Sequence, residues 1–310
     1  MSGQRVSNLK PYLALVALAL LWGFSFLLIK VALHDMSPIV LAMIRAAAGF
    51  AALAVFMLVS RRPLFSDGWR RRIIPYTVLA VLSGVVPWTA IAVGEQTISS
   101  GLASILNATT PLWAALLVIW IIPSDRPSGL NYVGVLIGLA GVVILVLPDL
   151  TAKGFRGSVA GAIAVLIASI SYAVSALYQR KKLRGHSVYE VSVGQLAVTT
   201  VLAIPIAAPS LSSFHFALPS MAAVIALGVG GSGLAYLLYY YINNTLGPVR
   251  ATGVTILVPM TAVLWGVVLL GETLSLPIII GMVVILAGIL LTNVRPASRE
   301  PVADRDSAAA

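Results

Sequence analysis

Polar and aromatic side chains recur at helical spacing inside the long apolar segments of this sequence. Tyr236, Tyr240 and Asn243 are spaced i, i+4 and i+7, so they share one face of a helix. Such a face offers rings, hydroxyls and amides, which bind a small molecule by packing and hydrogen bonding. Matching faces on other segments give the candidate binding residues Trp22, Ser25, Thr77, Trp88, Asn107, Thr110, Tyr172, Tyr236, Tyr240 and Thr255. Each has an ordinary alternative role, because hydroxyl residues mediate helix contacts and Trp and Tyr form interfacial belts.

Catalytic and metal-binding groups are not expected. The chain has no cysteine, and its three histidines fall at predicted helix ends or in loops. Ser232 lies in the glycine-rich stretch 228–233, which could suggest an intramembrane serine protease, but no histidine occurs in a membrane segment to serve as the base. Close packing or flexing better explains Gly230 and Gly231. We therefore expect no catalytic residue, metal or cofactor, and an intramembrane enzyme stands as the alternative of another class.

The composition requires lipid as the solvent for much of the chain. Hydrophobic residues make up 59%, charged residues 10%, and the mean hydropathy is +1.00 over 310 residues. The formal charge of +10 would suggest a nucleic-acid partner in a soluble protein, but here the location of the charge excludes one. The first apolar run, 11–33, is too long for a cleavable signal segment, whose core has about 7 to 15 apolar residues. We interpret it as a retained membrane helix.

Apolar runs of membrane-spanning length occur ten times, since a bilayer core of about 30 Å needs roughly 20 apolar residues in a helix. The predicted spans are 11–33, 38–60, 73–95, 100–122, 128–147, 156–178, 188–209, 217–242, 248–270 and 276–293. Turn residues such as Ser37-Pro38 and Pro123 separate them. The sequence therefore predicts an all-α integral membrane protein with ten transmembrane helices.

The basic residues predict the orientation of the helices. Fifteen of the twenty Lys and Arg fall in the termini or in the loops 61–72, 123–127 and 179–187, and only Lys153 and Arg156 fall in loops of the opposite face. Because Lys and Arg are retained on the cytoplasmic side, both termini are expected in the cytoplasm of a bacterial inner membrane. Lys30 and Arg250 are expected to snorkel from span ends, whereas Arg45 lies deeper, which leaves snorkelling and burial equally open.

The two halves of the chain resemble each other. Residues 104–111 align with 252–259 at a constant offset, so Pro111 corresponds to Pro259. Gly134 and Gly141 in the fifth span recur as Gly281 and Gly288 in the tenth. Residues 1–150 and 151–310 are thus predicted to be two five-helix repeats, and an odd number of helices inverts the second relative to the first. Inverted repeats are typical of alternating-access transporters, which bind substrate near the midplane between the halves.

These motifs also carry a family resemblance. Gly247-Pro-Val-Arg-Ala251 through Pro259 and then Leu269-Leu-Gly-Glu-Thr-Leu274, with Ile98 through Pro111 as the first copy, resemble the EamA-type drug/metabolite transporters, and within them bacterial amino-acid exporters of the YddG kind. The first copy departs from the pattern, since Ile122-Pro-Ser-Asp125 replaces the Leu-Gly-Glu ending. This departure puts any paired role for Glu272 in doubt.

The resemblance implies a metabolite exporter in which helices one, three, four, six, eight and nine surround a central cavity. Rings and hydroxyls without a central charge suit a neutral or zwitterionic molecule, so amino acids, including aromatic ones, are the expected substrate class. A drug or nucleotide-sugar carrier of the same fold is the alternative. The predicted hinge or helix-break residues are Pro111, Pro259, Gly230 and Gly231. Membrane lipid is the expected surrounding partner, and a monomer is the expected functional unit.

The acidic residues bear on the source of energy. All ten fall in loops, tails or within about a turn of a predicted helix end, whereas proton-coupled antiporters commonly use a carboxylate in mid-span. No nucleotide-binding loop of the Gly-x-x-x-x-Gly-Lys type occurs. We therefore expect a facilitator or exchanger. Glu95 and Glu272 are the two carboxylates that could instead support proton coupling, if they face a water-filled entrance to the interior.

Overall fold

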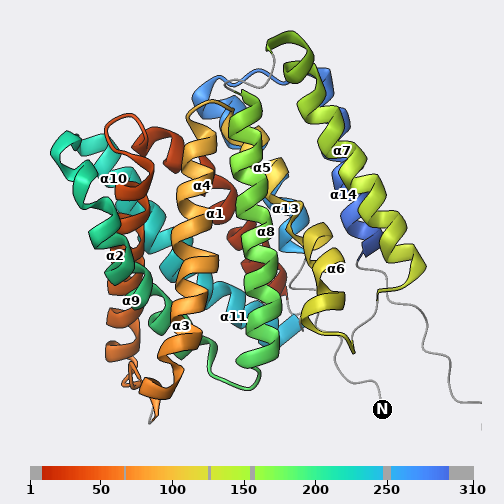
Figure 1. Ribbon diagram of the computed structural model, residues 1–310. Coiled ribbons are helices and arrows are strands. Elements are labelled where there is room, and N and C mark those ends of the chain that lie inside the picture. The colour runs from red at the N-terminus through yellow and green to blue at the C-terminus, as the bar shows by residue number, and fades with distance from the viewer. Residues whose placement is uncertain (1–8, 66–67, 125–126, 154–157, 247–252, 293–310) are drawn as a thin grey trace, which may run out of the picture.

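The computed structural model describes residues 9–65, 68–124, 127–153, 158–246 and 253–292, and every regular element in these ranges is a helix. The helices run roughly along a common axis and form one bundle (Figure 1). The elements of the first part of the chain are α1 (Leu9–Ala32), α2 (Pro38–Val59), η1 (Trp69–Arg72), α3 (Ile73–Ala80), η2 (Val81–Val85), α4 (Val86–Glu95), α5 (Ser100–Asn107), α6 (Thr110–Ile121) and α7 (Gly129–Lys153).

The second part of the chain is also helical throughout its described residues. Its elements are α8 (Ser158–Lys182), α9 (Val188–Ala207), η3 (Ala208–Ser213), α10 (Leu218–Ala226), η4 (Leu227–Leu234), α11 (Ala235–Leu246), α13 (Val254–Leu270) and α14 (Leu276–Thr292). Eight helical segments of the described residues are long and apolar enough to cross a membrane, and α13 and α14 are shorter apolar helices. The prediction of an all-helical membrane protein is confirmed.

Two of the membrane segments contain a turn of π-helix. The π-helical η2 lies between α3 and α4, and the longer π-helical η4 lies between α10 and α11. Gly84 in η2 and Ser232 in η4 are 148 residues apart, which is the offset that aligns Pro111 with Pro259. Wide turns of this kind interrupt regular backbone bonding and occur often at functional sites. The glycine-rich stretch around Gly230 and Gly231 therefore forms an irregular helix inside the bundle.

The two prolines predicted to interrupt helices behave differently. The fourth span is broken, because α5 ends at Asn107 and α6 begins at Thr110 with Pro111 in its first turn. In contrast, α13 runs from Val254 to Leu270 with Pro259 inside it, so no break of the helix occurs at Pro259 in this conformation. Because proline has no N–H, Pro259 cannot make the usual backbone bond to the carbonyl of the residue four positions earlier, yet the helix continues through it. Residues 247–252, which precede this helix, lie outside the described part of the chain.

The matching glycines of the fifth and tenth spans bring two helices into close contact. α7 and α14 lie side by side at one edge of the bundle (Figure 1). A Cβ on Gly134 would lie 2.7 Å from the carbonyl oxygen of Gly288, and one on Gly141 would lie 3.0 Å from that of Gly281. Small residues at these four positions allow the backbones to approach each other, as in other membrane helix pairs.

The connections divide between the two ends of the bundle. The basic segments 60–65, 68–72 and 183–187 lie at one end, which we call the basic end (Figure 1). The connections 33–37, 96–99 and 271–275 lie at the opposite end, which we call the outer end after the side of the membrane that the sequence predicts for it (Figure 1). The interior of the bundle lies between these two ends.

Candidate functional site

The interior contains an arginine that sequence analysis did not assign. Arg45 is the eighth residue of α2, about 10 Å along the helix from its start, and only 7% of its surface is exposed. Its Nε donates a hydrogen bond of 3.0 Å to Oγ of Ser232, and its guanidinium lies 4.2 Å from the centroid of the Trp88 ring. Arg45 therefore does not snorkel, and the expectation of an interior without charge is wrong.

Three predicted site residues gather around this arginine. Trp88 from α4 is 2% exposed, while Tyr172 from α8 and Tyr236 from α11 are half-buried and pack against the same apolar cluster as Trp88. Both tyrosines interact electrostatically with Arg45. The group combines residues from both parts of the chain, and Trp88 and Tyr236 are again 148 positions apart. We call Arg45, Trp88, Tyr172 and Tyr236 the central group.

Trp22 and Ser25 lie on α1 where it faces η4. The Trp22 ring nitrogen donates to the carbonyl oxygen of Gly231 at 3.2 Å, and its ring lies 5.8 Å from that of Tyr239. Ser25 is buried, and its hydroxyl donates to the carbonyl oxygen of Leu21 at 2.9 Å. A Cβ on Gly231 would lie 2.7 Å from Oγ of Ser25. This glycine thus allows α1 to approach the π-helical segment, and Tyr239 is a further aromatic residue beside Trp22.

The break in the fourth span exposes polar backbone to the interior. Oδ1 of Asn107 is buried and accepts no hydrogen bond in the described structure, while the carbonyl oxygen of Asn107 accepts from the Thr110 hydroxyl at 2.8 Å. The carbonyl oxygen of Leu106 accepts from the Ser169 hydroxyl of α8 at 3.0 Å. The break is therefore stabilised from across the bundle, because unpaired backbone groups are costly in a membrane. Thr255, half-buried on α13, occupies the corresponding position of the second part.

Two predicted residues lie away from the central group. Thr77 is in the first turns of α3, near the basic end, and its hydroxyl donates to the carbonyl oxygen of Ile73 at 2.8 Å. The ring of Tyr240 lies 4.5 Å from that of Tyr189, which in turn lies under the guanidinium of Arg62 at 4.9 Å. Arg62 belongs to the basic segment 60–65, so Tyr240 is closer to that end than to the central group. The side chain of Asn243 is outside the described residues.

Charged residues at the outer end bind helix termini. The Lys30 ammonium donates to the carbonyl oxygen of Glu95 and, at 2.9 Å, to that of Ile98, so it lies near the end of its span and binds the carbonyl end of α4. The Glu272 carboxylate accepts from the backbone amides of Ser100 at 2.7 Å and Gly101 at 3.1 Å, in the first turn of α5. Arg250, the other residue expected to snorkel, lies outside the described residues.

Glu95 is a buried carboxylate at the same end. It is the last residue of α4 and has no exposed surface, and neither side-chain oxygen accepts a hydrogen bond in the described structure. It interacts electrostatically with Lys30, Glu272 and Arg45, in decreasing order. Sequence analysis located Glu95 and Glu272 at helix ends correctly, but it could not show that one is enclosed and that the other caps a helix.

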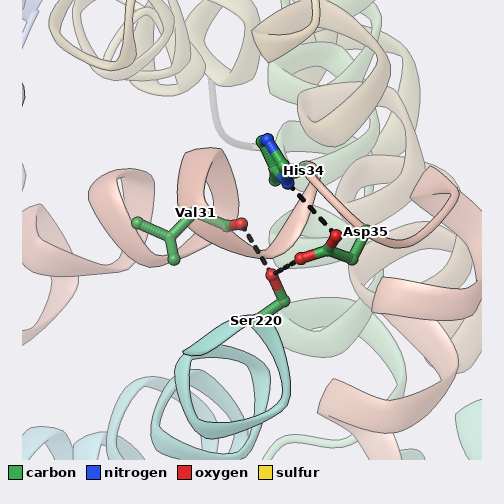
Figure 2. Close-up of polar contacts among 4 residues, drawn as sticks. All are labelled: Val31, His34, Asp35 and Ser220. Atoms are coloured by element: carbon green, nitrogen blue, oxygen red, sulfur yellow. Dashed lines mark hydrogen bonds and ion pairs between the residues drawn. The ribbon is translucent and has the colours of Figure 1, made fainter. Parts of the chain in front are cut away.

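A second contact at the outer end joins the α1–α2 connection to α10. Figure 2 shows the Ser220 hydroxyl between Oδ2 of Asp35 and the carbonyl oxygen of Val31, with Nδ1 of His34 3.1 Å from Oδ1 of Asp35. The hydrogen bond from Ser220, followed by that from His34, holds the pKa of Asp35 below its ordinary value. Asp35 thus acts as an ionised acceptor at the N-terminus of α10.

The basic end has contacts of its own between the two parts of the chain. Arg72 forms an ion pair with Glu190 of α9, and the Tyr76 hydroxyl donates to Oε1 of Glu190 at 2.9 Å. The Lys181 ammonium donates to the carbonyl oxygen of Ile121 at 2.8 Å. Polar contacts therefore join the two parts at both ends of the bundle, and the central group lies between them.

A bundle of apolar helices that encloses polar groups from both parts of the chain is the architecture of a membrane transport protein. The sequence model of the EamA-like transporter family matches residues 9–147 and again residues 159–294. The chain therefore belongs to the EamA-like transporter family.

Named relatives agree with this assignment. The chain is similar to the uncharacterized inner membrane transporter YedA of Escherichia coli K12, with 32% identity over 273 residues, 84% of this chain and 83% of the relative. It is also similar to the uncharacterized transporter YoaV of Bacillus subtilis 168, with 19% identity over 286 residues, 92% of this chain and 97% of the relative. A solved crystal structure with 20% identity covers 91% of this chain and 96% of its own at a TM-score of 0.63, which shows a shared fold.

Proposed function

We propose that this transporter exports amino acids, including aromatic ones, across a bacterial inner membrane by alternating access. The observation that carries the proposal is the central group, in which aromatic side chains from both parts of the chain surround a buried polar interior. Aromatic faces pack an apolar side chain, and the phenol hydroxyls and Asn107 offer hydrogen bonds to the polar end of an amino acid.

Alternating access is supported by the distribution of polar contacts between residues 1–150 and 151–310, which we propose to be inverted five-helix repeats. Glu272 and Asp35 bind across this division at the outer end, and Arg72 and Lys181 do so at the basic end. Each set joins a few discrete groups, so one set can break while the other remains. Rocking of the two repeats about the central group would then expose it to one side at a time.

We further propose that substrate moves down its own gradient, by facilitated transport or exchange. Glu95 and Glu272 lie at the end of α4 and just after α13, and the described acidic residues include none in the middle of a membrane helix. Proton coupling through Glu95 is the alternative, since a buried carboxylate without hydrogen bonds is a plausible proton carrier. Both termini are proposed to be cytoplasmic, with the monomer as the functional unit.

Uptake into proteoliposomes tests these proposals together. We expect a labelled aromatic amino acid to equilibrate across the membrane, and to exchange with unlabelled amino acid inside, without accumulation under a pH gradient of either sign. Concentrative uptake that is driven by the gradient and abolished by Glu95→Gln or Glu272→Gln would show proton coupling instead. Transport of a drug or nucleotide sugar in preference to every amino acid would replace the proposed substrate with that of the alternative carrier.

A further inference from the structure

The buried arginine of the central group makes no ion pair in the part of the chain that the structure describes. Nine-tenths of Arg45 is buried, and the acidic group that acts on it is Glu95, which is not within ion-pair distance. An ionised side chain inside a membrane protein is costly unless it is paired, and such residues commonly mark a substrate or ion pathway. The charge of Arg45 therefore calls for a partner that is not part of the protein.

The hydrogen-bonding groups of Arg45 point to the chemistry of that partner. Arginine carries five N–H donors, and in the described structure only Nε, bonded to Ser232, makes a hydrogen bond. The guanidinium face is covered by Trp88, which leaves the donors at its edge available, because they lie in the plane of the group. A planar edge with parallel donors matches a carboxylate, which accepts two hydrogen bonds side by side.

A second donor near this position also lacks an acceptor. Gln195 of α9 is 6% exposed, and its buried Nε2 makes no hydrogen bond in the described structure. Its side chain contacts that of Tyr236, a member of the central group. The unused donors of the Arg45 guanidinium and the buried amide of Gln195 suit an oxyanion better than a neutral guest, since buried donors without acceptors are rare in folded proteins.

We propose that Arg45 binds a carboxylate of the transported molecule, which makes the substrate class organic carboxylates with an aromatic or apolar body. This inference rests on the proposed transport function and narrows it. An amino acid belongs to the class through its carboxylate, and a carboxylic acid without an amino group also belongs to it. Trp88, Tyr172 and Tyr236 would pack the body of the molecule while Arg45 holds its charged end.

Thermal unfolding of the purified protein with matched ligands provides the test. The probes are phenylalanine, phenylalanine amide, phenethylamine and 3-phenylpropanoate, followed by aliphatic carboxylates with their amides. We expect the carboxylates to raise the melting temperature of the wild-type protein, and the amides and the amine to have little effect. Arg45→Gln should abolish the shift. Arg45→Lys keeps the positive charge but loses the planar pair of N–H donors, so it should weaken carboxylate binding on the order of 10- to 100-fold.

Two controls separate binding from folding. Arg184→Gln removes an exposed arginine at the basic end and should keep the carboxylate-dependent shift. Ser232→Ala removes the protein acceptor of Arg45 and should keep most of that shift, which a purely structural role of Arg45 would not allow. The proposal is overturned if no carboxylate stabilises the wild-type protein more than its amide does, or if Arg45→Gln retains the shift.

Flux measurements distinguish this result from failure of the proposed function. Transport of amino acids that is equally fast for their amides and unchanged in Arg45→Gln would leave the transport function standing and overturn the role of Arg45. Arg45-dependent binding of carboxylates without flux of any amino acid would support the role of Arg45 and overturn amino acids as the transported substrate.

Discussion

Replacement of Glu272 with Gln should shift the transporter away from the conformation described here. The Glu272 carboxylate accepts from two backbone amides in the first turn of α5, so it joins the end of α13 to the broken fourth span. Gly266 provides the space, since a Cβ there would lie 2.3 Å from Oε2 of Glu272. In the proposed alternating-access cycle, this contact would have to break whenever the interior opens to the outer end.

The size of the effect follows from the two hydrogen bonds. A hydrogen bond to a charged group contributes about 1.5 to 3 kcal/mol, and a neutral one contributes about half as much. Gln offers one neutral acceptor in place of two charged ones, and Glu272 is partly exposed, so the loss is reduced by solvent screening to about 2 kcal/mol. About 2 kcal/mol corresponds to a roughly 30-fold change in the equilibrium between closed and open outer ends.

Distance measurements between spin labels can detect this shift, because the chain has no cysteine of its own. Labels at Gln96→Cys and Ser275→Cys, both exposed at the outer end, would report its opening. We expect Glu272→Gln to increase the population of long distances, while Thr273→Ala, at an exposed neighbour, leaves it unchanged. Identical distance distributions and flux rates in wild type and Glu272→Gln would refute the gating role of this carboxylate.

Three further predictions concern the outer end, the site and the topology. Because the folded-state pKa of Asp35 is lowered, its contribution to stability is present above its ordinary value of 3.8 and is lost as the pH falls through the folded-state pKa. Asp35→Asn should therefore lower the melting temperature at pH 7, and the difference should close in strong acid; a constant difference would contradict it. Single replacements with Ala in the proposed site should lower flux several-fold with folded protein retained, and normal flux in most of them would show a packing role. The residues are Trp22, Asn107, Tyr172, Tyr236 and Thr255. Single cysteines at Ser66, Ser187 and Ser213 test the topology. Only the cysteine at Ser213 should react with an impermeant thiol reagent applied outside, and the reverse pattern would invert the orientation.

The helices could be predicted from the sequence because the thickness of a bilayer sets a minimum apolar length. The predicted span 38–60 corresponds to α2, which is observed at Pro38–Val59. The predicted span 188–209 corresponds to α9, observed at Val188–Ala207, and the 3-10 turn that follows it. The break before Pro111 was also predictable, since proline lacks an N–H and fits the first turn of a helix. These features depend on local chain chemistry and the solvent alone.

The interior of the site was less predictable because it depends on which helices meet. The position of Arg45 in its span allowed either burial or snorkelling, and only the approach of Trp88 and Ser232 from other helices accounts for its burial. Similarly, the sequence placed Tyr240 with Tyr236 on one face, but Tyr240 packs on Tyr189 towards the basic end. An arginine well inside an apolar run was the available signal for a buried charge.

Access to the interior from both sides of the membrane is the central claim, and a single cysteine at position 230 tests it most directly. Gly230 lies in the π-helical η4, and the nearest side-chain atom to a Cβ there is 3.8 Å away on Leu21, so a small side chain fits. In sealed right-side-out and inside-out vesicles, we expect an impermeant thiol reagent to modify Gly230→Cys from either side, and transported substrate to slow both reactions. Modification from one side only, under conditions in which the same protein transports substrate, would contradict alternating access to a shared interior site.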